Sequence, residues 1–91
     1  MKIEFDPAKS EKNIRERAIS FDLAVNFKLE TAKIWQDTRN DYGEKRFIAL
    51  GHIEKRLFSM VFTVRGNILR IISIRKANNK EVLDYEKYTQ S

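Results

Sequence analysis

Apolar and polar residues alternate most regularly between residues 56 and 77, on either side of Gly66-Asn67. This dipeptide accepts the positive φ angles of a two-residue hairpin turn, so the pattern predicts two paired strands with Arg65 opposite Ile68. One face of this hairpin is apolar and belongs in a core: Phe58, Met60, Phe62, Val64, Leu69 and Ile71. The other face is expected to be mixed: Ser59, Val61, Thr63, Arg65, Arg70, Ile72, Ile74 and Lys76.

Arg75 does not fit this simple alternation, because the assumed register places it on the core face, opposite Arg65 and Arg70. Either the register shifts near the end of the strand, as at a bulge, or Arg75 lies at the edge of the core. Arginines that project from a central hairpin are costly unless an anionic group meets them. The hairpin pattern therefore predicts an anion-binding face.

Weaker patterns predict the elements around the hairpin. Asp6-Pro7 is typical of a helix start, and Ser20 offers a second helix cap after a break near Ala18. In chain order we expect a strand at 2–5, helices at 7–17 and from 20, strands at 32–35 and 45–52, the hairpin, and a helix from Asn78 or Asn79 to about Tyr88. This order predicts a single α+β domain over residues 1–91, with a mostly antiparallel sheet, two N-terminal helices and one C-terminal helix.

The composition narrows the chemistry. The chain has no cysteine and one histidine, so neither disulfides nor a metal site of ordinary ligand spacing is expected. Its three glycines form no nucleotide-binding loop, and no cofactor is predicted. No apolar run approaches the length of a membrane span, and the start of the chain does not resemble a signal peptide. We expect a cytoplasmic protein without a membrane partner.

The net charge of +5 is distributed unevenly. Residues 1–43 hold eight Lys and Arg against eight Asp and Glu, whereas residues 44–76 hold eight against two, a net charge of +6. Residues 77–91 hold two against three. The positive excess therefore lies in the strand region, which favours a polyanion, with nucleic acid as the first interpretation. An acidic protein partner or a basic surface kept for solubility would give the same pattern.

Arginine and carboxylate side chains in the same region are compatible with RNA cleavage. RNA supplies its own 2′-OH nucleophile, so such a site needs cations, a proton acceptor and help for the leaving group. Glu44 is the first choice as acceptor and Glu81 the second, while Tyr85 or a guanidinium could assist the leaving group. For Tyr85 the simpler interpretation is packing of the last helix against the sheet. The cations available for phosphate are Arg46, Arg65, Arg70, Arg75 and Lys76.

A series of motifs resembles the BrnT family of toxins from bacterial type II toxin–antitoxin pairs, which are related in fold to the RelE-like ribonucleases. The matching stretches are Phe5-Asp6-Pro7-Ala8-Lys9 with Asn13, Ser20-Phe21 with Ala24, Gly43 to Phe47 with Leu50-Gly51, Val61 to Arg65, and Ile68 to Ala77 followed by Glu81 and Tyr85. Each stretch is short, but together they follow the family order over nearly the whole chain.

The resemblance implies an RNA-cleaving toxin that arrests translation, and it leaves open whether the RNA is cleaved free or on the ribosome. It also implies a BrnA-like antitoxin with a ribbon-helix-helix domain, joined to the toxin in a heterotetramer that reaches DNA only through the antitoxin. The functional residues would then be Arg46, Arg65, Arg75 and Lys76, with Glu44 nearby. The family often has Lys-His-Gly before Ser20, where this chain has Arg17-Ala18-Ile19. The alternative hypothesis is a non-catalytic module that binds RNA or a protein through its basic face.

Overall fold

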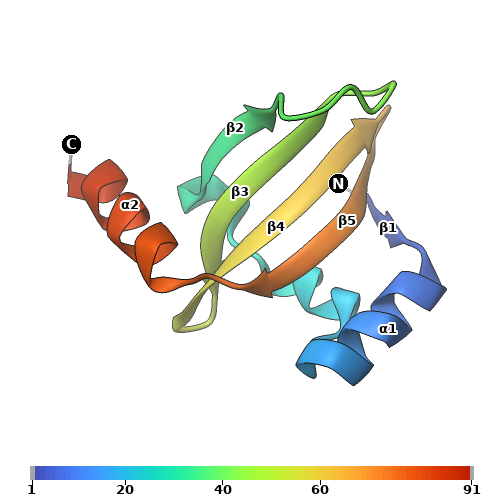
Figure 1. Cartoon of the computed structure of the whole chain (residues 1–91), viewed down its shortest axis with the longest axis horizontal. Coiled ribbons are helices and arrows are strands. Elements are labelled where there is room, and N and C mark those ends of the chain that lie inside the picture. The colour runs from blue at the N-terminus through green and yellow to red at the C-terminus, as the bar shows by residue number, and fades with distance from the viewer. Residues whose placement is uncertain (1, 91) are drawn as a thin grey trace.

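The computed structural model describes residues 2–90, which form a five-stranded sheet in the order β1-β5-β4-β3-β2 (Figure 1). β1 (Lys2–Phe5) runs parallel to β5 (Ile68–Lys76), and every other pair is antiparallel. The remaining strands are β2 (Lys33–Asp37), β3 (Arg46–Ile53) and β4 (Arg56–Arg65). The predicted α+β class and the mostly antiparallel sheet are thereby confirmed. The relation to the RelE-like fold stays a prediction.

The helices begin where the sequence provides caps. Asp6 accepts a hydrogen bond from the Ala8 N–H (2.9 Å) at the start of α1 (Pro7–Arg17), which ends at Ala18 in the left-handed region. Ser20 caps a second helix, as predicted, but η1 (Phe21–Asn26) is a 3₁₀ helix that closes with a Phe27 N–H to Ala24 bond. A further 3₁₀ turn, η2 (Leu29–Thr31), precedes β2, and α2 (Asn79–Gln90) ends the described chain. No helix among these is long and apolar enough to cross a membrane.

The hairpin keeps its predicted register from the turn to Thr63, which pairs with Arg70. Phe62 then pairs with Ile71, but Val61 pairs with Ser73, so Ile72 is an extra residue in a bulge. Beyond the bulge, each side chain of β5 points to the face opposite to the one that simple alternation predicts. This register shift resolves the ambiguity at Arg75, which lies beside Ser59 on the face away from the main core.

The same bulge overturns two face assignments made from the sequence. Ile74, predicted on the mixed face, is fully buried in the main core, and Lys76 lies opposite Phe58 on the core face, at its edge. Val64 was also expected in the core, yet it is 42% exposed because it lies near the turn, at the end of the hairpin. Alternation identifies the faces of a strand only up to its first irregularity.

The two faces of the sheet are covered unequally. On one face η1 and neighbouring residues form the main core with Met60, Phe62 and Ile71. On the other face, α2 covers only one end of the sheet, where Tyr85 packs with Leu50 and Leu57 (Figure 1). The uncovered remainder of that second face, called the open face below, carries Trp35, Arg46, Ile48, Ser59, Val61, Arg65, Arg70, Ser73 and Arg75. Any large ligand of the sheet has access to this surface.

Candidate active site

The start of α2 holds a carboxylate against the last residues of β5. Asn78 caps the helix by accepting a hydrogen bond from the Glu81 N–H (2.8 Å), and Glu81 Oε1 accepts from the Asn78 N–H (2.9 Å). This reciprocal capping box turns the Glu81 side chain back towards the sheet. There the Arg75 guanidinium donates to Glu81 Oε1 (2.8 Å) and Oε2 (2.9 Å). Two unrelated constraints therefore fix the orientation of one carboxylate.

This pairing also fixes the charge of both groups. The hydrogen bonds from Arg75 lower the pKa of Glu81 below its usual value, more than burial raises it, and the Asn78 N–H lowers it further. The hydrogen bonds to Glu81 raise the pKa of Arg75. Glu81 is consequently an anion throughout the neutral range. Its Oε1 accepts two of these hydrogen bonds and its Oε2 only one, so Oε2 keeps a lone pair for another donor.

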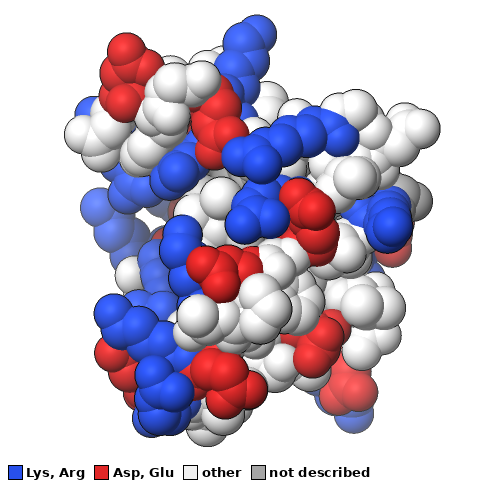
Figure 2. Space-filling model, turned by 90° about the vertical axis from the view of Figure 1, so that its right-hand side faces the viewer, with Lys and Arg blue, Asp and Glu red and all other residues white. Residues whose placement is uncertain are grey.

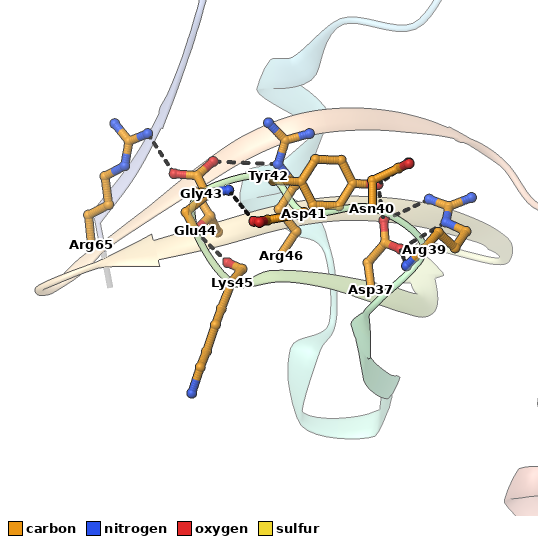
Figure 3. A network of polar contacts seen from close by, with 11 residues as sticks. Asp37, Arg39, Asn40, Asp41, Tyr42, Gly43, Glu44, Lys45, Arg46 and Arg65 are labelled. Carbon is orange, nitrogen blue, oxygen red and sulfur yellow. Dashed lines mark hydrogen bonds and ion pairs between the residues drawn. The ribbon is translucent and has the colours of Figure 1, made fainter.

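A second arginine follows β2. The Asp37 side chain, only 1% exposed, accepts hydrogen bonds from Arg39 Nε (2.8 Å) and NH2 (2.7 Å) and from the Tyr42 hydroxyl (3.0 Å) (Figure 3). The Arg39 guanidinium holds the pKa of Asp37 far below its usual range. Arg39 itself is 68% exposed, and its positive charge acts to lower the pKa of Arg75. Both arginines line one depression of the open face.

Between these two arginines the open face is hollowed. The depression, called the Arg75 hollow below, has a volume of about 400 Å³ and is lined by Trp35, Arg39, Ile48, Ser59, Val61, Ser73, Arg75 and Glu81. It combines two cations, one carboxylate, two hydroxyl groups and an indole. Such a set can bind a phosphate and transfer a proton next to it.

The predicted base Glu44 lies with Arg46 and Arg65 in a second group of side chains, called the Glu44 cluster below, which Tyr42 connects to Asp37 (Figure 3). Arg65 NH2 donates to its Oε1 (2.9 Å) and Arg46 Nε to its Oε2 (3.4 Å). The Arg46 guanidinium lies over the Tyr42 ring, 4.1 Å from its centroid. The hydrogen bond from Arg65 is the main reason why the pKa of Glu44 is lowered. Three of the residues predicted for the site, Glu44, Arg46 and Arg65, do meet.

The structure separates the other predicted residues from this cluster. Arg75 is opposite Ser59, which lies six residues before Arg65 on β4, roughly 20 Å along the strand. Arg70 is on the same face but binds Glu4 (3.2 Å). Arg65 and Arg75, which were predicted to act together at the cleaved phosphate, thus lie apart, Arg65 in the Glu44 cluster and Arg75 in the Arg75 hollow.

Two further predicted residues lie away from both clusters. Lys76 faces the opposite side of the sheet, where it lines a depression with Leu23 and Arg56. Tyr85 is 7% exposed, its ring lies 5.3 Å from that of His52, and its hydroxyl donates to the Thr31 carbonyl (2.8 Å). Its described contacts are those of packing between α2 and the sheet.

The arginines of the open face form ion pairs within the fold. Each arginine of the open face and its margin has a carboxylate partner: Arg39 with Asp37, Arg46 and Arg65 with Glu44, Arg70 with Glu4, and Arg75 with Glu81. Glu4 and Glu81 come from outside residues 44–76, so the charge count of that segment does not include them. Figure 2 shows the molecule from the side of β1 and α1, where Lys and Arg are densest along one edge and acidic groups lie among them.

Sequence reasoning gave no role to Asp37, Arg39 or Trp35, because it predicted a strand at 32–35 and only a polar connection between that strand and the one at 45–52. The available signal was Asp37-x-Arg39 directly after a strand, at a spacing that lets the arginine fold back on the carboxylate. Within residues 2–90 no group of three His, Cys, Asp or Glu side chains is arranged to hold a metal ion.

The family model described as the ribonuclease toxin BrnT of type II toxin–antitoxin systems matches residues 5–81. This range includes the Glu44 cluster, the residues that line the Arg75 hollow, and the start of α2. A search of curated proteins found no match.

Proposed function

The chain belongs to the BrnT family of ribonuclease toxins of type II toxin–antitoxin systems, and from this premise we propose that it cleaves RNA in the Arg75 hollow without a metal ion. The substrate 2′-oxygen attacks the adjacent phosphorus, and the bond from phosphorus to the 5′-oxygen breaks. The products are a 2′,3′-cyclic phosphate and a free 5′-hydroxyl. The attacking 2′-OH loses one proton, and the leaving 5′-oxygen gains one from solvent.

In this mechanism Glu81 Oε2 takes the proton of the 2′-OH, because it is anionic at neutral pH and has a lone pair free of the described hydrogen bonds. Arg75 and Arg39 stabilise the additional negative charge of the pentacoordinate phosphorane. The exposed Arg39 is also able to hydrogen-bond the leaving oxygen. Arg46, Arg65 and Arg70 hold flanking phosphates, which replace the carboxylates that these arginines bind in the free protein.

The observation that carries the proposal is that two guanidinium groups and an oriented carboxylate line one hollow. The depression next to the Glu44 cluster is less suitable. It is lined by three carboxylates, those of Asp37, Asp41 and Glu44, and by one cation, Lys45. Such a lining repels phosphate, so the electrostatic field favours binding of RNA phosphate in the Arg75 hollow.

The test is incubation of a defined single-stranded RNA with the purified, antitoxin-free protein in EDTA. We expect cleavage with cyclic-phosphate ends, and no cleavage of the same oligonucleotide synthesised with 2′-deoxy sugars. Cleavage of the deoxy oligonucleotide, or cleavage that stops when EDTA is added, would contradict the mechanism. If a folded protein binds the RNA and leaves it intact even when ribosomes are added, the non-catalytic module is the better interpretation.

The family implies an antitoxin protein as partner. We further propose that this antitoxin is of the BrnA-like, ribbon-helix-helix kind, that it forms a heterotetramer with the toxin, and that its acidic groups lie across the hairpin and α2.

Arg65, 57% exposed on its side chain, is the most accessible of the hairpin arginines that form ion pairs. Arg65→Glu should weaken antitoxin binding by at least ~10-fold in a calorimetric titration. Unchanged affinity in Arg65→Glu and Arg70→Glu would exclude this docking surface.

A further inference from the structure

Trp35 is the only tryptophan of the chain, and it lies on the edge strand β2 with 38% of its surface exposed. It belongs to neither of the two buried apolar clusters. Its indole lines the Arg75 hollow and also a neighbouring groove of about 470 Å³ between β2 and α2, so it forms the wall between the two depressions. The largest aromatic side chain of the protein therefore borders the hollow that Arg39 and Arg75 also line.

The immediate surroundings hold the indole but leave 38% of Trp35 exposed. Trp35 pairs with Ile48 on β3, and the Lys33 ammonium lies 5.3 Å from the ring centroid. Lys33 is itself held by Asp84 of α2, at 2.7 Å. A fixed aromatic surface beside an anion-binding hollow is the combination that proteins use for single-stranded nucleic acid, where cations follow the backbone and aromatic rings stack on bases.

Across the sheet, the indole of Trp35 and the guanidinium of Arg75 lie on different sides of the hollow, so that stacking of a base and binding of a phosphate use different residues. Trp35, Ile48, Val61 and Ser73 are consecutive partners on β2, β3, β4 and β5. Three strand spacings place Trp35 about 14 Å from β5, with the hollow between them. Arg75 lies two residues beyond Ser73 and closes the far side. Because the hollow lies next to the indole, a base that stacks on Trp35 can place its phosphate in the hollow, on the side of Arg75.

We propose that Trp35 is the stacking surface for an unpaired nucleobase next to the phosphate held by Arg75 and Arg39. The ligand class is single-stranded RNA, since a paired base has no free face to offer. Every base has such a face, so this subsite selects unpaired over paired RNA and discriminates little among the four bases. The inference rests on the proposed function and adds the kind of RNA that the hollow accepts.

A single tryptophan permits a direct test in the intact protein. A 2′-O-methyl RNA oligonucleotide cannot be cleaved by 2′-OH attack, so binding is measured apart from activity. We expect the oligonucleotide to quench tryptophan emission in the concentration range in which a labelled copy gains fluorescence anisotropy. Annealing the complementary strand to it should abolish the quenching. Binding that is seen by anisotropy with unchanged emission would overturn the stacking subsite and leave the proposed function intact.

Variants supply the second arm of the test. Trp35→Ala and Trp35→Leu should weaken binding of the oligonucleotide by ~5- to 150-fold, the range for loss of one base stack. Trp35→Phe should retain most of the affinity, because a phenyl ring also stacks. The matched control is Leu83→Ala, since Leu83 is 61% exposed and lines only the neighbouring groove. Equal affinity in wild type, Trp35→Ala and Trp35→Phe would contradict the inference, while a folded wild type that neither binds nor cleaves RNA would overturn both proposals.

Discussion

Glu81→Gln is expected to lower the rate of RNA cleavage by ~10²- to 10⁴-fold, the usual contribution of a positioned general base. Glutamine has nearly the same shape, can still accept the Asn78 N–H in the capping box, and can still accept one hydrogen bond from Arg75. It cannot take a proton from the 2′-OH. The loss should therefore appear in the chemical step, measured under single-turnover conditions, with little change in RNA affinity.

Glu44→Gln is the matched control for this variant, because it removes the other carboxylate that pairs with arginines of the open face. It should change the cleavage rate by less than ~10-fold, since the Glu44 cluster is placed to bind flanking phosphates. A large loss in Glu44→Gln together with a small loss in Glu81→Gln would move the reaction to the Glu44 cluster, as first predicted from the sequence.

The pH dependence of cleavage follows from the same pair of residues. The hydrogen bonds from Arg75 lower the pKa of Glu81 below its usual value, so the base is already deprotonated throughout the neutral range. Arg39 and Arg75, with raised pKa values, stay protonated well above pH 8. The single-turnover rate of wild type should thus change little between about pH 5.5 and pH 8. A tenfold rise with each pH unit would instead indicate attack assisted by hydroxide alone and would exclude Glu81 as the base.

Local signals in the sequence were sufficient for most of the fold. Gly66-Asn67 fixes the turn, Asp6 and Ser20 start their helices, and Asn78 begins α2, each through contacts within a few residues along the chain. The bulge at Ile72 had no such signal. It lies in a strand that is flanked by β1 and β4, which are distant from it or irregularly paired with it along the chain, and a one-residue insertion changes the face of every residue that follows.

The candidate site could be predicted only in part, for a related reason. The chemistry of arginine predicts phosphate ligands, but the grouping of Arg65 and Arg70 depends on carboxylates that are distant in sequence. Arg70 meets Glu4 across 66 positions, and Arg65 meets Glu44 across 21. Arg39 and Trp35 join the Arg75 hollow only because β2 is at the edge of the sheet next to β3. Sheet order decides these neighbours, and no local pattern encodes it.

Arg75→Ala is the second variant with a large expected effect, a fall of ~10²- to 10³-fold in the cleavage rate. This is the typical loss when one preorganised donor to a transition-state oxyanion is removed. Arg75→Lys should restore only a small part of the activity, because an ammonium cannot bind a carboxylate and a phosphate in the bidentate manner of a guanidinium. Arg65→Ala, which removes a cation of the same face from the Glu44 cluster, should weaken RNA binding and leave the single-turnover rate at saturation nearly unchanged.

The pH profile of Arg75→Ala distinguishes a chemical role from a structural one. Without the guanidinium, the main cause of the lowered pKa of Glu81 is gone, so the residual activity should fall off at a higher pH on the acid side than in wild type. Urea unfolding at pH 7 should differ little between the two proteins, because the Arg75 side chain is 38% exposed and partly exposed ion pairs contribute little to stability. An acid limb that does not move, or a rate loss equal to that of Arg65→Ala, would show that Arg75 acts only as one more phosphate ligand.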